Sequence, residues 1–260
     1  MEITASLVKE LRERTWIWMM ECKKALTAAN GDIELAIEEL RKKGLAKAAS
    51  KADREAFEGA IKVVVEGDKA YIVSVSCETD FLANSDRYKD MLSSVVAELK
   101  AGKTAEDAKA MIDRDYSLEM GENLQVRDYK IVTGTKIGAY VHSNNKLAAI
   151  VVSWDASSDE EKLKQVAMHV TAANPEFLRA SDISEEVVEK EKAIQLEAMK
   201  NDPKTAGKPD EVLLKIIEGK MGKFKSEISL LEQNFVINPD IKVKDFVWEN
   251  SLTAFYRISI

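Results

Sequence analysis

The sequence has few of the residues that build disulfide frameworks, metal centres and membrane spans. Its 260 residues include only two cysteines, Cys22 and Cys77, with no CxxC spacing. Free thiols in a reducing cytoplasm are therefore predicted. No run approaches the ~20 apolar residues of a transmembrane helix, and the first residues lack the apolar stretch of a signal peptide. A net charge of −7 argues against a general binder of nucleic acid or of anionic membranes.

Motifs of catalysis are missing as well. The chain has no GxxxxGK[ST] phosphate loop, no GxGxxG, no HExxH and no GxSxG. Histidine occurs twice: His169 falls in an apolar helical stripe and is predicted to be a satisfied core residue, whereas His142 follows a predicted strand. An enzyme that uses His142 with nearby carboxylates is one hypothesis, but no carboxylate stands at a telling spacing. We expect neither enzymatic chemistry nor a cofactor.

Residues 1–55 predict a small module of three helices and a connector. The second helix should stop at Asn30-Gly31, Asp32 should cap the third, and Gly44 is placed to end it. So few apolar residues make a marginal core, which favours a docking unit. The basic stretch Lys42–Arg54, which contains Lys51, is predicted to be a solvated helical connector.

The central part of the chain repeats one pattern. Strand-like segments at Gly59–Val65 and Ala70–Ser76 form a hairpin followed by a helix, and Gly138–His142 and Leu147–Ser153 repeat that unit. We interpret this as an internal duplication in an α+β fold of antiparallel sheets with helices. Residues 56–135 would form the first half of the core and residues 136–182 the first part of the second half.

Two amphipathic patterns joined by a polar loop at Asn201–Pro209 follow. They predict an inserted antiparallel helical hairpin over residues 183–228. A structural arm with one solvated face is the plainer interpretation of this coiled-coil-like arm, and a surface for a dimer or a partner is the alternative. Residues 229–260 should return to the second half as strands.

The junction between the first repeated hairpin and its helix carries Thr79-Asp80-Phe81-Leu82. One interpretation is a helix cap followed by a core aromatic. The other is a projecting tip, with Phe81 anchored in a pocket of a partner and Asp80 beside a charge there. The second copy ends instead in Trp154-Asp155-Ala156-Ser157. The repeated unit therefore does not require the Asp-Phe pair, which favours the projecting tip.

Two blocks carry a family resemblance, Leu11-Arg12…Thr15…Met19–Leu26 and Cys77–Phe81. Shorter matches at Asn30-Gly31-Asp32, Met168-His169-Val170, Pro175-Glu176-Phe177 and Val187–Glu191 support them. Over nearly its whole length the sequence resembles bacterial elongation factor Ts, the guanine-nucleotide exchange factor for elongation factor Tu. The resemblance implies a cytoplasmic protein of translation elongation, without covalent chemistry, direct nucleic-acid binding or membrane contact. It also implies that the N-terminal module is of the ubiquitin-associated (UBA-like) type.

The resemblance assigns partner contacts in three groups. The N-terminal module would dock on the nucleotide domain of elongation factor Tu through Arg12, Met19, Met20, Lys23 and Lys51. The tip that enters beside the partner's magnesium and phosphate site would be Thr79, Asp80, Phe81 and Leu82. Core contacts would come from His142, Phe235, Val236 and Ile237. The alternative is a partner-binding module of the same family without exchange activity.

The chain departs from the family at the turn between its first two helices. Trp16-Ile17-Trp18 stand where small, glycine-rich residues are usual, and Arg14–Leu26 alone would pass as one continuous helix. We expect both tryptophans to be largely exposed at that turn. They are either additional anchors for the partner or a perturbation that strains the turn, because a left-handed turn suits glycine and disfavours a bulky residue.

Overall fold

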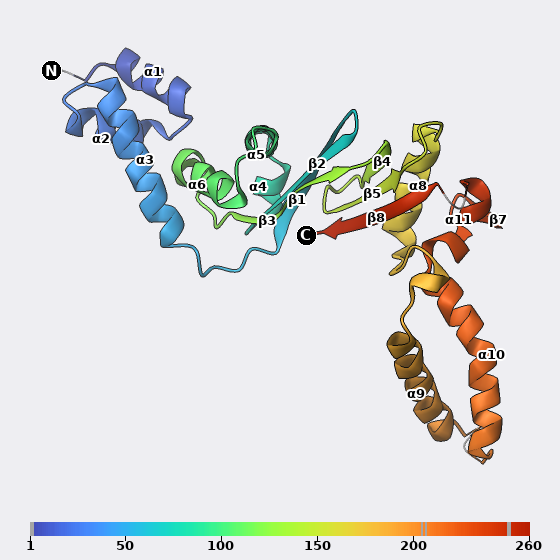
Figure 1. The fold of residues 1–260 in the computed structure, drawn as a ribbon. Helices are drawn as coiled ribbons and strands as arrows, with labels where there is room; N and C mark the ends of the chain where they lie inside the picture. Colours follow the sequence, from blue (N-terminus) through green and yellow to red (C-terminus); the bar gives the residue numbers. More distant parts are fainter. Residues whose placement is uncertain (1–2, 204, 206, 249–250) are drawn as a thin grey trace. The chain divides into compact units, whose positions relative to one another are not determined.

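The computed structural model describes residues 3–203, 205, 207–248 and 251–260. The fold is α+β, as predicted, with helices and antiparallel strands in two compact units. The first unit runs to Val132 and also takes in Val141–Leu147 and Ile258–Ile260. The second holds Thr133–Tyr140 and Ala148–Arg257. Figure 1 labels the elements along the chain.

The three predicted N-terminal helices are present: α1 (Ala5–Thr15), α2 (Met19–Ala28) and α3 (Ile33–Ala49). Asp32 caps α3 by accepting the backbone N–H of Leu35 at 3.0 Å, which satisfies one of the donors that a helix N-terminus leaves without a partner. Leu11, Cys22, Leu26 and Leu40 form the buried centre of the three helices. The break between α1 and α2 shows that the single-helix interpretation of Arg14–Leu26 is wrong.

Gly44 does not end the third helix. The helix continues to Ala49, and a Cβ at Gly44 would lie 2.9 Å from the carbonyl oxygen of Asp113 and 3.0 Å from that of Arg114. The glycine therefore permits a close approach to the end of α6 (Ala105–Asp115).

The first sheet has strand order β1-β2-β3, with β1 (Glu58–Glu66), β2 (Lys69–Cys77) and β3 (Gln125–Thr133). Glu66 pairs with Lys69, so the predicted hairpin turn is confirmed, with Gly67 at a φ of 60°. Tyr88, Met91 and Val95 of α5 (Asp86–Lys100) pack on the inner face of this sheet. Short helices α4 (Asp80–Asn84) and α7 (Ser117–Met120) complete this part. The strand β3 and the helix α7 were not predicted.

The second half repeats the plan. Strands β4 (Lys136–Val141) and β5 (Leu147–Ser153) are followed by α8 (Glu160–Ala173), and β8 (Leu252–Ser259) completes the sheet in the order β4-β5-β8. Gly138 meets α8 so closely that a Cβ there would lie 2.3 Å from the backbone carbon of Leu163. Each half thus has a three-stranded sheet with a helix after its second strand, which supports the interpretation of a duplication.

The predicted helical hairpin consists of α9 (Glu185–Asn201) and α10 (Asp210–Ile228), which run side by side in Figure 1. Their shared apolar face buries Val188, Met199, Leu213, Ile217 and Met221. Lys204 and Ala206 of the predicted loop lie outside the described residues. The remaining elements are the 3-10 turns η1 (Ala180–Asp182) and η2 (Leu230–Glu232), the strands β6 (Asn234–Phe235) and β7 (Asn238–Lys242), and the helix α11 (Val243–Phe246).

Candidate functional site

The predicted tip lies where the chain leaves β2 and enters α4. Thr79 caps this short helix, its hydroxyl accepting the N–H of Leu82 at 3.3 Å. Phe81 is 88% exposed, Thr79 and Asp80 are exposed, and Leu82 is half-buried. The expectation that Phe81 projects into solvent is confirmed. The core-aromatic interpretation is wrong.

A carboxylate from a distant part of the chain holds the base of the tip. Glu122, between α7 and β3, accepts the backbone N–H groups of Glu78 at 2.8 Å and Thr79 at 2.9 Å. The hydroxyl of Thr79 donates to the same carboxylate at 2.5 Å. In return Glu78 accepts the N–H of Asn123 at 2.7 Å. Hydrogen bonds to an ionised acceptor are strong, so an exposed Phe81 stands on a firmly held backbone.

Beneath the tip, the side chains of Cys77 and Tyr88 are buried and uncharged. The thiol of Cys77 donates to the carbonyl of Thr79 at 3.2 Å, and burial raises its pKa to about 12. The hydroxyl of Tyr88 donates to the carbonyl of Val75 at 2.6 Å, and burial raises its pKa as well. Both groups remain protonated at neutral pH and act as donors. The hydroxyl of Ser76 accepts a hydrogen bond from Arg127 at 3.0 Å.

The turn between α1 and α2 is exposed and unusual in its backbone. Trp16 takes the left-handed conformation, with φ 57° and ψ 12°, which costs a non-glycine residue roughly 1–2 kcal/mol. Trp16 and Trp18 are 61% and 75% exposed, as expected. The predicted docking residues Arg12, Met19, Met20 and Lys23 are exposed on the same two helices.

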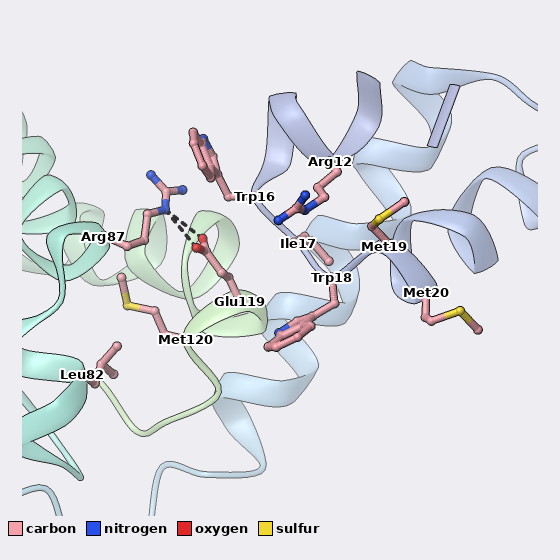
Figure 2. Close-up of a pocket in the computed structure, with 10 residues that line it drawn as sticks. All are labelled: Arg12, Trp16, Ile17, Trp18, Met19, Met20, Leu82, Arg87, Glu119 and Met120. Atoms are coloured by element: carbon pink, nitrogen blue, oxygen red, sulfur yellow. Dashed lines mark hydrogen bonds and ion pairs between the residues drawn. The ribbon is translucent and has the colours of Figure 1, made fainter. Parts of the chain in front are cut away.

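An apolar groove of about 690 Å³ lies between this turn and the helices beside the tip (Figure 2). The turn contributes Trp16, Trp18, Met19 and Met20 to one side, and Leu82 and Met120 line the other. The structure therefore brings three of the predicted docking residues, Arg12, Met19 and Met20, and one residue of the tip, Leu82, to the same hollow.

Arg87 and Glu119 are the charged pair of this groove. Arg87 Nε lies 2.9 Å from the Glu119 carboxylate, and the Arg87 guanidinium carbon lies 4.7 Å from the ring centre of Tyr116 and 5.7 Å from a ring of Trp16. Burial raises the pKa of Glu119 despite the opposing effect of Arg87. The pair joins α5 to α7 beside Trp16.

Comparison with known proteins identifies the family. The model of the family described as "Elongation factor TS" matches residues 78–260. Elongation factor Ts of Klebsiella pneumoniae is 44% identical, over 100% of this chain and 92% of that protein. Elongation factor Ts of Spiroplasma citri is 43% identical over 98% of this chain and 90% of that protein, and that of Pseudomonas entomophila is 46% identical over 93% and 84%. The chain belongs to the elongation factor Ts family. It is thereby assigned to translation elongation.

Two residues that the elongation factor Ts resemblance assigned to partner contacts are buried. Lys51 is 5% exposed and its ammonium group donates to the carbonyl of Gly121, and burial lowers its pKa. The expectation of a solvated connector is wrong at this residue. Phe235 is 1% exposed and stacks on Phe246 with ring centres 4.3 Å apart, so it is a core residue.

The other residues assigned to core contacts are accessible. Val236 and Ile237 are 51% and 52% exposed, and they form the turn between β6 and β7 instead of the predicted strand. His142 is exposed at the start of the turn between β4 and β5, where its backbone N–H donates to Leu147 at 2.8 Å. His169 is 1% exposed with both ring nitrogens bonded, which confirms its prediction as a satisfied core histidine.

Two further properties hold for the residues that the structure describes. None of their histidine, cysteine, aspartate and glutamate side chains gather in a group of three or more that could hold a metal ion. None of their helices is both long enough and apolar enough to cross a bilayer.

Proposed function

We propose that this chain is a guanine-nucleotide exchange factor. It binds elongation factor Tu in the GDP-bound form and promotes release of GDP, so that GTP can bind. No covalent step belongs to this activity. The proposal rests on membership of the elongation factor Ts family and on the geometry of the tip.

The observation that carries the proposal is the exposed Phe81 beside Asp80. A phenyl ring left 88% exposed by its own chain is an apolar surface that a partner can cover, and aromatic anchors in pockets dominate the energy of many interfaces. The Glu122 hydrogen bonds hold the backbone beneath the ring. Little ordering of this segment is then required on binding, which favours affinity.

The tip would act on the metal site of the partner. A GTPase holds its diphosphate through a phosphate loop and Mg²⁺, and Mg²⁺ requires near-ideal octahedral coordination by oxygen. A phenyl ring inserted between the helices that support this site, with the carboxylate of Asp80 alongside, displaces the coordinating groups. GDP then loses part of its binding energy.

One contact is too small for this effect. Binding is reciprocal, so a factor that weakens GDP binding is itself bound more weakly when GDP is present. A ~10⁴-fold shift requires about 5.5 kcal/mol of differential binding. We therefore propose that the N-terminal docking face of Arg12, Met19, Met20 and Lys23 acts together with the tip. His142, Val236 and Ile237 would add further contacts.

Release of fluorescent GDP from elongation factor Tu tests the proposal. The wild-type chain should accelerate release, and the Asp80→Ala/Phe81→Ala double variant should bind without accelerating it. Trp154→Ala is the matched control, because Trp154 follows the corresponding strand of the second half and is 50% exposed. Binding by the wild type without acceleration would establish the partner-binding module in place of the exchange factor.

A further inference from the structure

The turn between β6 and β7 presents two adjacent aliphatic side chains to solvent. Val236 and Ile237 are each about half exposed, although Phe235 immediately before them is part of the core. The pairing of β6 with β7 is irregular at Asn234 and Phe235. The strand ladder alone therefore does not account for how this turn is held.

A chain of side-chain hydrogen bonds leads from the hairpin to this turn. The amide nitrogen of Gln233 donates to the carbonyl of Glu227 at 2.6 Å, and this orients the amide oxygen of Gln233 toward His169. His169 Nε2 lies 2.8 Å from that oxygen, so Nε2 must carry the proton. The unprotonated Nδ1 then accepts the backbone N–H of Val236 at 3.1 Å.

The partners of His169 are satisfied only when its ring is neutral. The ring is buried, and its centre lies 5.9 Å from that of Phe235. Glu227 is in the last turn of α10, where helix carbonyls lack partners within the helix. The chain Glu227–Gln233–His169–Val236 thus joins the end of the helical hairpin to the backbone of an exposed apolar turn.

We propose that His169 is a positioning residue that presents Val236 and Ile237 to the partner. The inference rests on the proposed function and deepens it, because the surface served is one of its contacts. The two side chains offer no hydrogen-bonding group, so the matching surface on the GTPase is an apolar depression. A turn that is already ordered loses less conformational freedom on binding than a free one.

Two substitutions of His169 separate positioning from packing. The amide oxygen of asparagine lies near the place of Nδ1 and can accept the N–H of Val236. The amide nitrogen of glutamine lies near the place of Nε2 and can donate to Gln233, but it leaves the N–H of Val236 without an acceptor. Both remove the ring that packs on Phe235, so His169→Asn and His169→Gln should lower the thermal unfolding temperature to a similar extent.

The affinity for GDP-bound elongation factor Tu and the amide exchange of Val236 in the free chain are the readouts. We expect His169→Gln to bind about tenfold more weakly and to lose protection at Val236, on the scale of one buried hydrogen bond. His169→Asn should retain both properties more closely. In a Val236→Ala/Ile237→Ala background, the difference between the two variants in affinity should disappear, because the side chains being presented are gone.

Equal affinities of the two His169 variants would overturn the inference, and so would retained protection of Val236 in His169→Gln. Gln233→Met retains the imidazole of His169 but removes both its acceptor and the donor to Glu227, so unchanged binding by that variant would also count against the chain of hydrogen bonds. If the wild type binds elongation factor Tu without accelerating GDP release, exchange fails as the function while affinity still decides the role of His169. No binding by the wild type overturns both.

Discussion

Replacing Phe81 by alanine should separate function from stability. The ring is 88% exposed in the free chain, so nearly all of its apolar surface remains available to a partner. Complete burial of a phenylalanine side chain is worth about 1.5–3 kcal/mol. We therefore expect Phe81→Ala to lose about 2 kcal/mol of binding to the state that releases GDP, which is about 30-fold in the acceleration of release.

Folding should hardly change in the same variant. Substitutions at exposed positions alter the free energy of unfolding by about 0.5 kcal/mol or less, so the midpoint of thermal unfolding should move by less than about 2 °C. The capping hydroxyl of Thr79 and the hydrogen bonds of Glu122 are untouched by the change.

Stopped-flow release of fluorescent GDP from elongation factor Tu, at several concentrations of factor, measures the loss. Trp154→Ala should retain the wild-type rate. An unchanged rate in Phe81→Ala would refute the role of the ring. A fall of more than 5 °C in the unfolding midpoint would show instead that Phe81 supports the fold.

Three other predictions follow from the same structure. Glu122→Ala leaves two backbone N–H groups and the hydroxyl of Thr79 without their acceptor. Its free energy of unfolding in urea should be about 1–2 kcal/mol lower than that of the wild type, and it should accelerate GDP release less. Glu122→Gln should be intermediate in both measurements. Trp16→Gly replaces a bulky residue that has a left-handed backbone conformation, so it should raise the free energy of unfolding by about 1 kcal/mol; a lower midpoint of thermal unfolding would contradict backbone strain at Trp16. Weaker binding of the partner by this variant would identify Trp16 as an anchor, and stronger binding would identify it as a perturbation. Burial lowers the pKa of His169 in the folded chain. Below the ordinary histidine pKa of about 6.5, the unfolded chain therefore binds more protons at this residue than the folded chain does. The free energy of unfolding should fall from pH 7 to pH 5.5 in urea titrations, and His169→Asn should lack the part of this fall that is due to His169.

The local periodicity of apolar residues was sufficient to predict the helices and strands that have one buried face. The alternation in β1 and β2 and the apolar stripe of α5 could be predicted, because each packs against the same core. The strand β3 was missed because it lies at the edge of its sheet. Ile131 there remains 43% exposed, which weakens the alternation that marks a strand.

The errors at the site have a common physical cause, which is contact between distant segments. Gly44 looked like a helix end because nothing in the local pattern indicates the nearby carbonyls of α6. Lys51 looked solvated because Gly121, its acceptor, lies far along the chain. Phe235 and Val236 are both apolar, and only the surrounding fold decides that the first is buried and the second exposed. Nothing in the local sequence marks Glu122 as a site residue: it is an acidic residue that follows Gly121, which has a left-handed backbone conformation in the structure.

The ends of the two duplicated strands explain why only one half has a projecting tip. In the second half the hydroxyl of Ser153 donates to the carbonyl of Ser251 at 2.9 Å, and the N–H of Trp154 donates to the same carbonyl at 3.1 Å. That end is therefore tied to the chain just before β8. In the first half the Glu122 side chain accepts the backbone N–H groups of Glu78 and Thr79, which follow Cys77, the residue that corresponds to Trp154.

A side chain from the segment after α7 can reach the strand end from one side and leave the other side open. The backbone N–H groups are then satisfied, as buried or partly buried donors must be, while the next residues turn outward as α4 with Phe81 exposed. The difference between a packed strand end and a tip that can enter a partner thus goes with the acceptor at the strand end, which is the carbonyl of Ser251 in one half and the carboxylate of Glu122 in the other. That acceptor lies outside the repeated unit, so the same hairpin and helix can support the fold in one half and carry the proposed exchange activity in the other.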